Sequence, residues 1–508
     1  MKFFNRNRNP DTDTSFLSEN LGKHAAKAFA SVAVAQILAN IIGLGGTIVL
    51  ARMLGPEEFG LMAMLATAVA LLTVFESFGL YYATIQKKDL SSDELNFLFW
   101  ANLGIASVIA VIFFTSSGFI ADFFEEPELE PLSQILALAF IFRGGANQHA
   151  ALLNRKLQHS LSSIATIMGV TFATIGAIIM AYYGYGVWAL VWRQVIEAVV
   201  RALALWVLTG WIPRFVAYKK EYLSSFSFGA SMTFSSLMYY LSRNSDDILI
   251  GKFIGATSLG FYKLSYQILL LPLTRINEPI AQVMVPLLSQ LQDDAERYKA
   301  AYLKATHIII FMQLPIGIVF AFHSEPIIRI LFGDDWLPAA PVLSWLACVL
   351  ILQGMANTTG WLMISQKRSK EIFYWSLFSS VTTILAFIIG LLSYGMVGVA
   401  AAYTISSYLK LPVLIYICGH KGPVTQRTFY EIILVHLFPG LTFAALNYLA
   451  LVYLISDNML YNFLIIGGCG LLFLPCVLIF PQSRKFLFEG IAFVKNRIIK
   501  KKAIETQT

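Results

Sequence analysis

Long apolar runs separated by short polar segments occupy nearly the whole chain. The first run extends from about Ala28 to Ala51, and one membrane crossing needs roughly 20 mostly apolar residues to cover about 30 Å of hydrocarbon. We therefore predict an all-α polytopic membrane protein with about fourteen transmembrane helices. The predicted spans are 28–51, 59–84, 95–119, 132–153, 161–182, 186–210, 224–245, 257–288, 302–322, 338–364, 371–392, 396–418, 429–454 and 460–481.

The polar segments between the runs alternate in charge. Lys and Arg gather in every second segment, and cytoplasmic loops of membrane proteins carry such an excess of basic residues. Arg52, Lys252 and Arg329 are exceptions near the predicted outer side. The alternation predicts that both termini are cytoplasmic. The basic segments include the N-terminal one with Lys2, Arg6 and Arg8, then Lys87-Lys88, Arg155-Lys156, Lys219-Lys220, Arg297 with Lys299, Lys367-Arg368, and Lys421 with Arg427.

The composition agrees with a chain embedded in lipid. Of 508 residues, 57% are hydrophobic and 13% are charged, and the mean hydropathy is +0.67. A soluble protein of this size would have too little polar surface. The formal net charge of +7 lies in short clusters beside apolar runs, so membrane topology explains it better than a nucleic-acid partner does. The four cysteines lack metal-ligand spacing, and neither a metal nor a cofactor is predicted.

An internal repeat organises the spans. Residues 48–60 align without gaps on residues 248–260. Because each half contains an even number of spans, both halves enter the membrane in the same sense, as in transporters built from parallel repeats. Two further matches, about 210 residues apart, pair Gly144-Gly-Ala-Asn147 with Gly354-Met-Ala-Asn357, and Tyr183-Gly184 with Tyr394-Gly395.

The repeat predicts how the chain is divided. Residues 1–27 form a cytoplasmic segment whose polarity gives no sign of a cleavable signal peptide. Two six-helix lobes follow in 28–213 and 222–420, and two more helices in 428–482. The tail, 483–508, mixes aromatic and basic residues. It is interpreted either as an amphipathic helix on the anionic inner leaflet or as a solvated basic stop after the last span.

Ionisable side chains inside the spans are the candidate functional residues. Each costs at least about 2.5 to 3.5 kcal/mol at membrane depth, so such groups usually face a protein-lined cavity or one another. Most are cationic here, and a cationic cavity would suit a phosphate or an acidic sugar. The substrate-binding candidates are Arg143, Arg193, Arg201, Lys263, Arg275 and Lys410. Candidate coupling or pairing carboxylates are Glu76, Glu197, Asp246, Asp247 and Glu278.

Some of these charges have a structural alternative. Arg193, Glu197 and Arg201 recur every four residues, which puts them on one helix face. This stripe either lines a cavity with one positive charge left over or locks its helix to another. Arg275 and Glu278 stand three residues apart, which favours a self-contained pair.

The remaining cations favour a cavity. Arg143, Lys263 and Lys410 have no carboxylate nearby in the sequence, so a hydrated interior would compensate them. Lys410 and Arg201 alternatively extend their stems toward a membrane surface. Aromatic residues in the spans allow stacking on sugar rings, but packing or interfacial anchoring is favoured for them. These residues include Tyr239, Tyr240, Tyr262, Tyr266, Trp361 and Trp375.

Several segments resemble polysaccharide-export flippases of the MOP superfamily, and the WzxC-like branch in particular. They are Ala51 to Leu61, Asp246 to Tyr262, Leu271 to Pro279 and Pro286 to Asp293, and the resemblance covers nearly the whole chain. It implies two six-helix lobes around a central cavity. Alternating access would then move undecaprenyl-diphosphate-linked oligosaccharide units to the outer leaflet for surface polysaccharide synthesis. The family motif matches at Asp246, Gly251, Gly255 and Gly260, where the glycines are expected to be structural.

The resemblance also implies partners and a location. The expected partners are the lipid-linked oligosaccharide and the bilayer, with other membrane proteins of polysaccharide assembly as a further option. The expected location is the cytoplasmic (inner) membrane. An alternative is a cation-coupled multidrug exporter of the same superfamily, in whose cavity acidic residues would dominate. A membrane glycan polymerase or ligase is disfavoured, because the outer loops are too short to shelter its active site.

Overall fold

The computed structural model describes residues 21–76, 80–87, 90–216, 240, 244–454, 458–481 and 484. All regular structure in these residues is helical, which confirms the all-α prediction. Contacts within the chain divide it into two compact units, residues 1–260 and 261–508. The predicted seventh span, apart from residues 240, 244 and 245, and the tail, apart from Arg484, lie outside the described residues.

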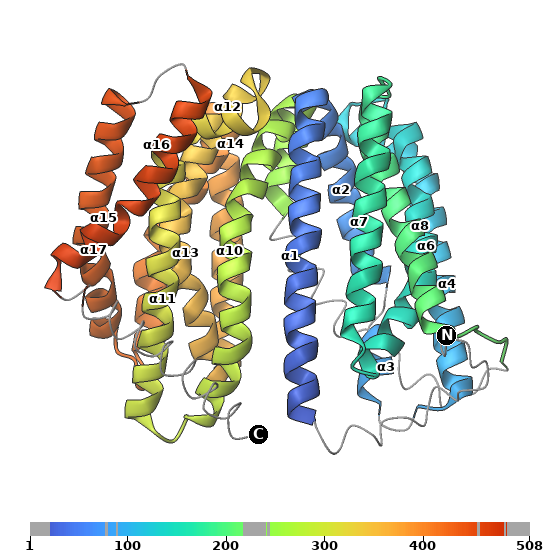
Figure 1. Ribbon diagram of the computed structural model, residues 1–508, viewed down its shortest axis with the longest axis horizontal. Coiled ribbons are helices and arrows are strands. Elements are labelled where there is room, and N and C mark those ends of the chain that lie inside the picture. Colours follow the sequence, from blue (N-terminus) through green and yellow to red (C-terminus); the bar gives the residue numbers. More distant parts are fainter. Residues whose placement is uncertain are drawn as a thin grey trace. The chain divides into compact units, whose positions relative to one another are not determined.

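The first unit is a bundle of long helices with short connecting helices. Helix α7 packs against both α1 and α8, and α6 packs against α4 and α8 (Figure 1). Large apolar side chains such as Val34, Ile41 and Phe172 are exposed on this bundle, as expected where lipid is the solvent. The helices are α1 (Leu21–Met53), α2 (Pro56–Glu76), α3 (Leu80–Gln86), α4 (Ser92–Thr115), α5 (Ser117–Phe124), α6 (Leu129–Arg155), α7 (His159–Tyr182) and α8 (Val187–Thr209).

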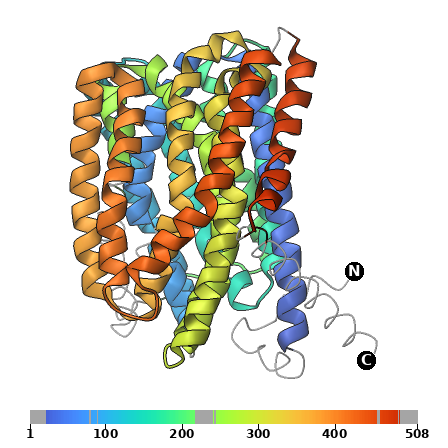
Figure 2. The same ribbon diagram turned by 90° about the vertical axis from the view of Figure 1, so that its left-hand side faces the viewer.

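The second unit repeats this organisation and adds C-terminal helices. Its α14 is two helices joined at Tyr394 and Gly395, where the backbone is not helical, and Figure 2 shows the two halves as adjacent orange rods. The elements are α10 (Ala256–Gln290, which begins in the first unit), α11 (Ala295–Phe322), α12 (Ser324–Phe332), the 3-10 helix η3 (Asp334–Ala339), α13 (Ala340–Ser365), α14 (Ser369–Gly419), α15 (Gln426–Tyr453), α16 (Met459–Leu471) and α17 (Phe473–Ile479).

Every predicted span that falls on described residues coincides with a helix or with two consecutive helices. Nine helices in the described part of the chain are long and apolar enough to cross a membrane. Helices α6 and α8 are not among them, although they have 27 and 23 residues. Their polarity is the reason, because α6 carries Arg143 and the run Asn147 to His149, whereas α8 carries three charges. These two helices therefore carry four of the seven predicted site residues of the first unit, Arg143, Arg193, Glu197 and Arg201.

The repeat appears in the backbone. Leu157 after α6 and Lys367 after α13 stand 210 residues apart and both adopt left-handed φ angles, of 55° and 57°. The next amide in each turn bonds back to the helix: Gln158 N donates to Leu153 O at 2.8 Å, and Arg368 N donates to Met363 O at 2.9 Å. Equivalent helices in the two halves thus end in the same turn.

One predicted match of the repeat has the wrong register. Gly395, which precedes the second half of α14, has φ 58° and ψ −138°. Its backbone counterpart is Gly186, the residue before α8, with φ 53° and ψ −133°, a conformation open essentially only to glycine. Tyr185-Gly186 therefore corresponds to Tyr394-Gly395, and the predicted match of Tyr183-Gly184 was shifted by two residues.

Two repeat-related glycines make a reciprocal contact inside the first unit. A Cβ added at Gly60 would overlap the carbonyl oxygen of Ala256, and a Cβ added at Gly260 would overlap that of Pro56. Residues 56 and 60 align on residues 256 and 260, so the same pair of positions forms both contacts, as around a local two-fold axis. Only residues without a Cβ allow the starts of α2 and α10 to approach so closely.

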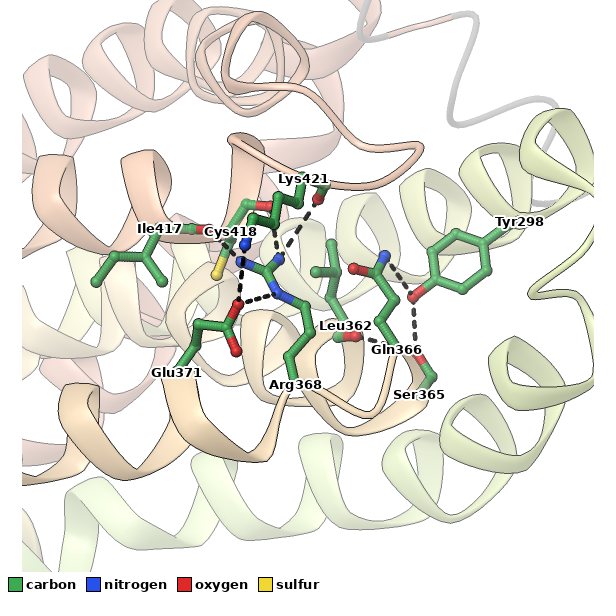
Figure 3. A network of polar contacts seen from close by, with 9 residues as sticks. All are labelled: Tyr298, Leu362, Ser365, Gln366, Arg368, Glu371, Ile417, Cys418 and Lys421. Carbon is green, nitrogen blue, oxygen red and sulfur yellow. Dashed lines mark hydrogen bonds and ion pairs between the residues drawn. The ribbon is translucent and has the colours of Figure 1, made fainter.

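A buried arginine ties the loop before α14 to the end of that helix (Figure 3). Arg368 donates from Nη2 to Ile417 O at 2.6 Å, from Nη1 to Cys418 O at 3.1 Å, and from Nε to Glu371 Oε1 at 3.3 Å. The last carbonyls of a helix lack intrahelical partners, and a cation there also suits the helix dipole. The sequence predicted this arginine only as a marker of a cytoplasmic loop.

We expect Arg368→Ala to lower the stability of the second unit by about 1–3 kcal/mol, because it leaves buried carbonyls without donors. The thermal unfolding midpoint of the purified protein in detergent measures this effect. Lys370→Ala removes an exposed charge from the first turn of α14 and should leave the midpoint unchanged. Equal midpoints for the two variants would contradict a capping role for Arg368.

Candidate functional site

Helices α6 and α8 bring the predicted charges of the first unit together. Arg143 of α6 donates from Nη2 to Gln194 Oε1 of α8 at 3.1 Å. A cavity of about 40 Å³ lies against these two side chains and against Glu197 and Arg201. That volume holds about one or two water molecules. We call Glu76, Arg143, Arg193, Gln194, Glu197 and Arg201 the arginine cluster.

The arginine cluster carries a surplus of positive charge. Arg143, Arg193 and Arg201 supply three cations, and Glu76 and Glu197 supply two carboxylates when ionised, which leaves +1. Glu76 ends α2, is only 5% exposed, and lies within electrostatic range of Arg143 and Arg201. These five described side chains form no ion pair with one another. Their positive charge is therefore not neutralised by direct pairing.

One donor of the cluster is buried without a partner. Arg201 Nε has no hydrogen-bond partner among the described residues. A Cβ added at Gly169 of α7 would come within 3.2 Å of Arg201 Cβ and 3.1 Å of Glu197 O, so the glycine allows α7 to pack closely against this face of α8. A buried donor left without an acceptor costs about 1–3 kcal/mol, and more when it is charged. Water or an anion in the cavity would supply that acceptor.

Arg193 has a different environment from the rest of the stripe. Its guanidinium donates from Nη2 to Gly43 O at 3.2 Å and from Nη1 to Thr47 Oγ1 at 3.3 Å, both on α1. Of the two interpretations open for the stripe, helix locking therefore describes Arg193. The cavity interpretation describes Glu197 and Arg201, which line the cavity.

The second unit contains the other predicted cations. Lys410 lies in the second half of α14 and is 9% exposed. It donates to Thr383 Oγ1 at 2.6 Å and to Ser379 Oγ at 3.5 Å, so its amino group points toward the first half of α14 rather than toward a membrane surface. Lys263 is half-buried on α10. Arg275 and Glu278 are both exposed, and these two described residues do not form the favoured pair with each other.

The predicted acidic pair Asp246 and Asp247 is buried, with exposed fractions of 5% and 2%. It lies on a helix over residues 244–253. Nearby in the sequence, Tyr240 donates its hydroxyl to Thr67 O of α2 at 2.7 Å. These acidic residues are thus enclosed in the first unit, whereas the arginine cluster lines a cavity.

The predicted aromatic residues mostly pack inside the bundles. Tyr262 and Trp361 are buried, and the rings of Tyr262 and Tyr266 stack with centroids 6.2 Å apart. Trp375 is half-buried, and Tyr239 lies outside the described residues. Packing therefore accounts for these described rings without a sugar partner.

Buried polar contacts on α11 were missed in the sequence. His307 Nδ1 lies 2.9 Å from His436 Nε2 of α15, and Gln313 donates to Asn277 Oδ1 of α10 at 3.0 Å. The available signal was a lone histidine or amide inside an apolar run, which does not say which helix will carry its partner. Gln194 was missed for the same reason, although it stands beside Arg193.

Two cations on the predicted outer side, Lys252 and Arg329, are paired with acidic residues. Lys252 Nζ lies 2.8 Å from Glu125 Oε1, and this hydrogen bond lowers the pKa of the Glu125 carboxyl. Arg329 pairs with Asp334 at 2.9 Å. Partial burial raises the pKa of neighbouring Glu126, and the Glu57 charge adds to that effect. Two of the three outer exceptions to the charge alternation, Lys252 and Arg329, thus lie in ion pairs.

The family follows from a match over much of the chain. A family model described as "Polysaccharide biosynthesis protein" matches residues 49–341, more than half of the sequence. The chain belongs to this family. The match begins near the end of α1 and extends to the start of α13, so it contains the whole arginine cluster.

Named relatives of this polysaccharide biosynthesis protein act in the synthesis of several polymers. Lipopolysaccharide biosynthesis protein WzxC of Escherichia coli K12 is 27% identical over 397 residues, covering 75% of this chain and 80% of the relative. Teichuronic acid biosynthesis protein TuaB of Bacillus subtilis is 31% identical over 317 residues, covering 59% and 65%. These matches confirm the resemblance to the WzxC-like branch.

Solved structures share the fold. A lipid II flippase MurJ in an inward closed conformation superposes with a TM-score of 0.70 at 18% identity, covering 88% of this chain and 98% of that one. An inward-facing multidrug resistance MATE transporter of the MOP superfamily has a TM-score of 0.58 at 14% identity, covering 84% and 100%. At this identity the likeness establishes a polytopic membrane transporter fold.

Proposed function

We propose that this chain is a flippase that moves undecaprenyl-diphosphate-linked oligosaccharide units across the cytoplasmic (inner) membrane by alternating access between lobes 28–213 and 222–420. Both termini are cytoplasmic in this proposal. The observation that carries it is the arginine cluster, which places a surplus positive charge and an unpartnered donor of Arg201 beside a cavity at membrane depth. A diphosphate supplies the anionic oxygens that guanidinium groups bind in pairs.

The residues of the arginine cluster have different roles in this mechanism. Arg143 and Arg201 contact the diphosphate, while Arg193 holds α8 against α1. Glu76 and Glu197 limit the surplus to one charge, which matters because a transport site must bind its substrate and also release it. The roughly 40 Å³ cavity is too small for a saccharide, so helices must separate for substrate to enter.

The names of the relatives support the substrate class. WzxC and TuaB are named for lipopolysaccharide and teichuronic acid, and a 26% identical relative is the succinoglycan biosynthesis transport protein ExoT of Rhizobium meliloti. A multidrug exporter has the same fold. Its site for cationic drugs would need a surplus of carboxylates, and the arginine cluster has the opposite balance.

Deletion of the gene tests this function. We expect lipid-linked oligosaccharide units to accumulate on the cytoplasmic face and surface polysaccharide to fall, with both effects reversed by the wild-type gene on a plasmid. Leaflet distribution is measured by accessibility to a glycosidase in inverted and right-side-out vesicles. Normal surface polysaccharide in the deletion strain would refute the proposed function.

A further inference from the structure

A second and larger cavity lies in the first unit, away from the arginine cluster. It measures about 180 Å³ and opens between α1, the last turn of α6 and the first turns of α7. At about 30 Å³ per water molecule, it holds about six waters or a polar group of that size. Apart from two alanines of α1, it is lined by Gln36, Asn154, His159, Ser162, Ser163 and Thr166.

The lining is polar and consists mainly of acceptors. Ser163 donates its hydroxyl proton to His159 O at 3.0 Å, and Thr166 donates to Ser162 O at 3.2 Å, so both hydroxyls retain only lone pairs for a ligand. His159 Nδ1 lies 2.7 Å from Asn154 Oδ1. A carboxamide oxygen can only accept, so Nδ1 carries the proton and Nε2 of the neutral ring is an acceptor.

The hydrogen-bonding groups of the lining indicate which kind of ligand the pocket can bind. The lining contains neither Lys, Arg, Asp nor Glu, so it offers no counter-charge to a phosphate or to an ammonium group. Apolar groups would leave the lining acceptors unpaired, at about 1–3 kcal/mol for each buried one. A group that carries several hydroxyls meets both conditions, because each hydroxyl donates one hydrogen bond and accepts others. Saccharides have this chemistry.

A polar stripe along α1 connects this pocket with the arginine cluster. Gln36, Asn40, Gly43 and Thr47 recur every three or four residues and therefore share one face. Gln36 donates to Asn40 Oδ1 at 3.4 Å, and Asn40 Nδ2 is buried without a partner among the described residues. Arg193 donates to Gly43 O at one end of this stripe. Gln36 lies seven residues before Gly43, which is about 10 Å along the axis of α1.

We propose that the pocket between α1, α6 and α7 is a saccharide-binding subsite, which holds sugar hydroxyls of the substrate on the predicted cytoplasmic side before transport. This proposal rests on the proposed function and adds a neutral subsite to the anionic one. The arginine cluster binds the diphosphate, and the pocket binds hydroxyls through Ser162, Ser163, Thr166 and His159.

Cysteine labelling tests the subsite. A full-length protein with its four native cysteines replaced carries Ser163→Cys, or Ser160→Cys as the control, because Ser160 is exposed on the same helix and does not line the pocket. The probe is N-ethylmaleimide, added to inverted membrane vesicles. Vesicles come from cells that make lipid-linked oligosaccharide and from cells that lack the first sugar-phosphate transferase. We expect at least threefold slower labelling of Ser163→Cys when the saccharide is present, and no change for Ser160→Cys.

Each result decides the proposal. Equal labelling of Ser163→Cys in the two membranes overturns it: fast labelling in both means that the pocket holds only water, and slow labelling in both means that a phospholipid headgroup or a tight seam blocks it. Ser163→Leu, which fills the pocket, should lower surface polysaccharide at least tenfold at equal protein level, whereas Ser160→Leu should not. If the deletion strain accumulates lipid-linked units but labelling does not respond, the subsite fails and the flippase function stands.

Discussion

Replacing Arg143 or Arg201 by alanine is expected to slow transport at least tenfold while the protein still folds. Either change removes one of the two guanidinium groups beside the cavity and cancels the surplus charge of the arginine cluster. Charge-assisted hydrogen bonds contribute about 1.5–3 kcal/mol, and each 1.4 kcal/mol changes an equilibrium tenfold. The rate at which lipid-linked oligosaccharide reaches the outer leaflet of proteoliposomes measures the effect.

Two further variants separate binding from general damage. Arg297→Ala removes an arginine whose side chain is 77% exposed, and it should leave transport unchanged. Adding Glu76→Gln to Arg143→Ala restores the net charge of +1, so part of the lost rate should return. Full transport by both Arg143→Ala and Arg201→Ala would refute the anionic subsite. A loss that Glu76→Gln does not relieve would assign Arg143 a specific contact rather than a charge effect.

Substituting alanine for Gly60 or Gly260 is expected to destabilise the first unit strongly. Each added Cβ overlaps a backbone carbonyl oxygen, of Ala256 or of Pro56, which cannot move aside by changing rotamer. Overpacking typically costs about 1–3 kcal/mol, and backbone overlap lies at the upper end of that range. Both variants should give a lower thermal unfolding midpoint and less monodisperse protein in detergent.

A matched glycine provides the control for that experiment. Gly104 lies in α4, is exposed, and has no atom within 4 Å of an added Cβ. Gly104→Ala should therefore keep or raise the midpoint, since alanine is favoured over glycine in a helix by about 1 kcal/mol. If Gly60→Ala matched Gly104→Ala, the reciprocal contact would not contribute to stability.

The spans could be predicted because a lipid solvent imposes a length and a composition on each helix. Short connecting helices such as α3 and α5 escaped prediction, because seven or eight residues do not establish a period. The start of α4 has a local signal in Ser91-x-x-Glu94, a capping-box pattern, and Ser91 Oγ accepts from Glu94 N at 3.1 Å. Local signals of this kind need no knowledge of distant residues.

The site was predictable only in part. The spacing of Arg193, Glu197 and Arg201 gave their common face, but it did not show that Arg193 reaches Gly43 on α1, some 150 residues away. Arg275 and Glu278 had favourable spacing, and yet they do not pair. Helix spacing fixes which side chains share a face, whereas tertiary packing decides what that face meets.

The turn after α13 has a consequence for how the chain enters the membrane. Lys367 holds a left-handed backbone at φ 57°, a conformation that costs about 1–2 kcal/mol for a residue with a Cβ. Glycine would relieve this strain, but it would remove a positive charge from a loop between two spans, and such charges help to set the direction in which new helices thread during synthesis. At this corner, the sequence keeps the charge together with a strained backbone.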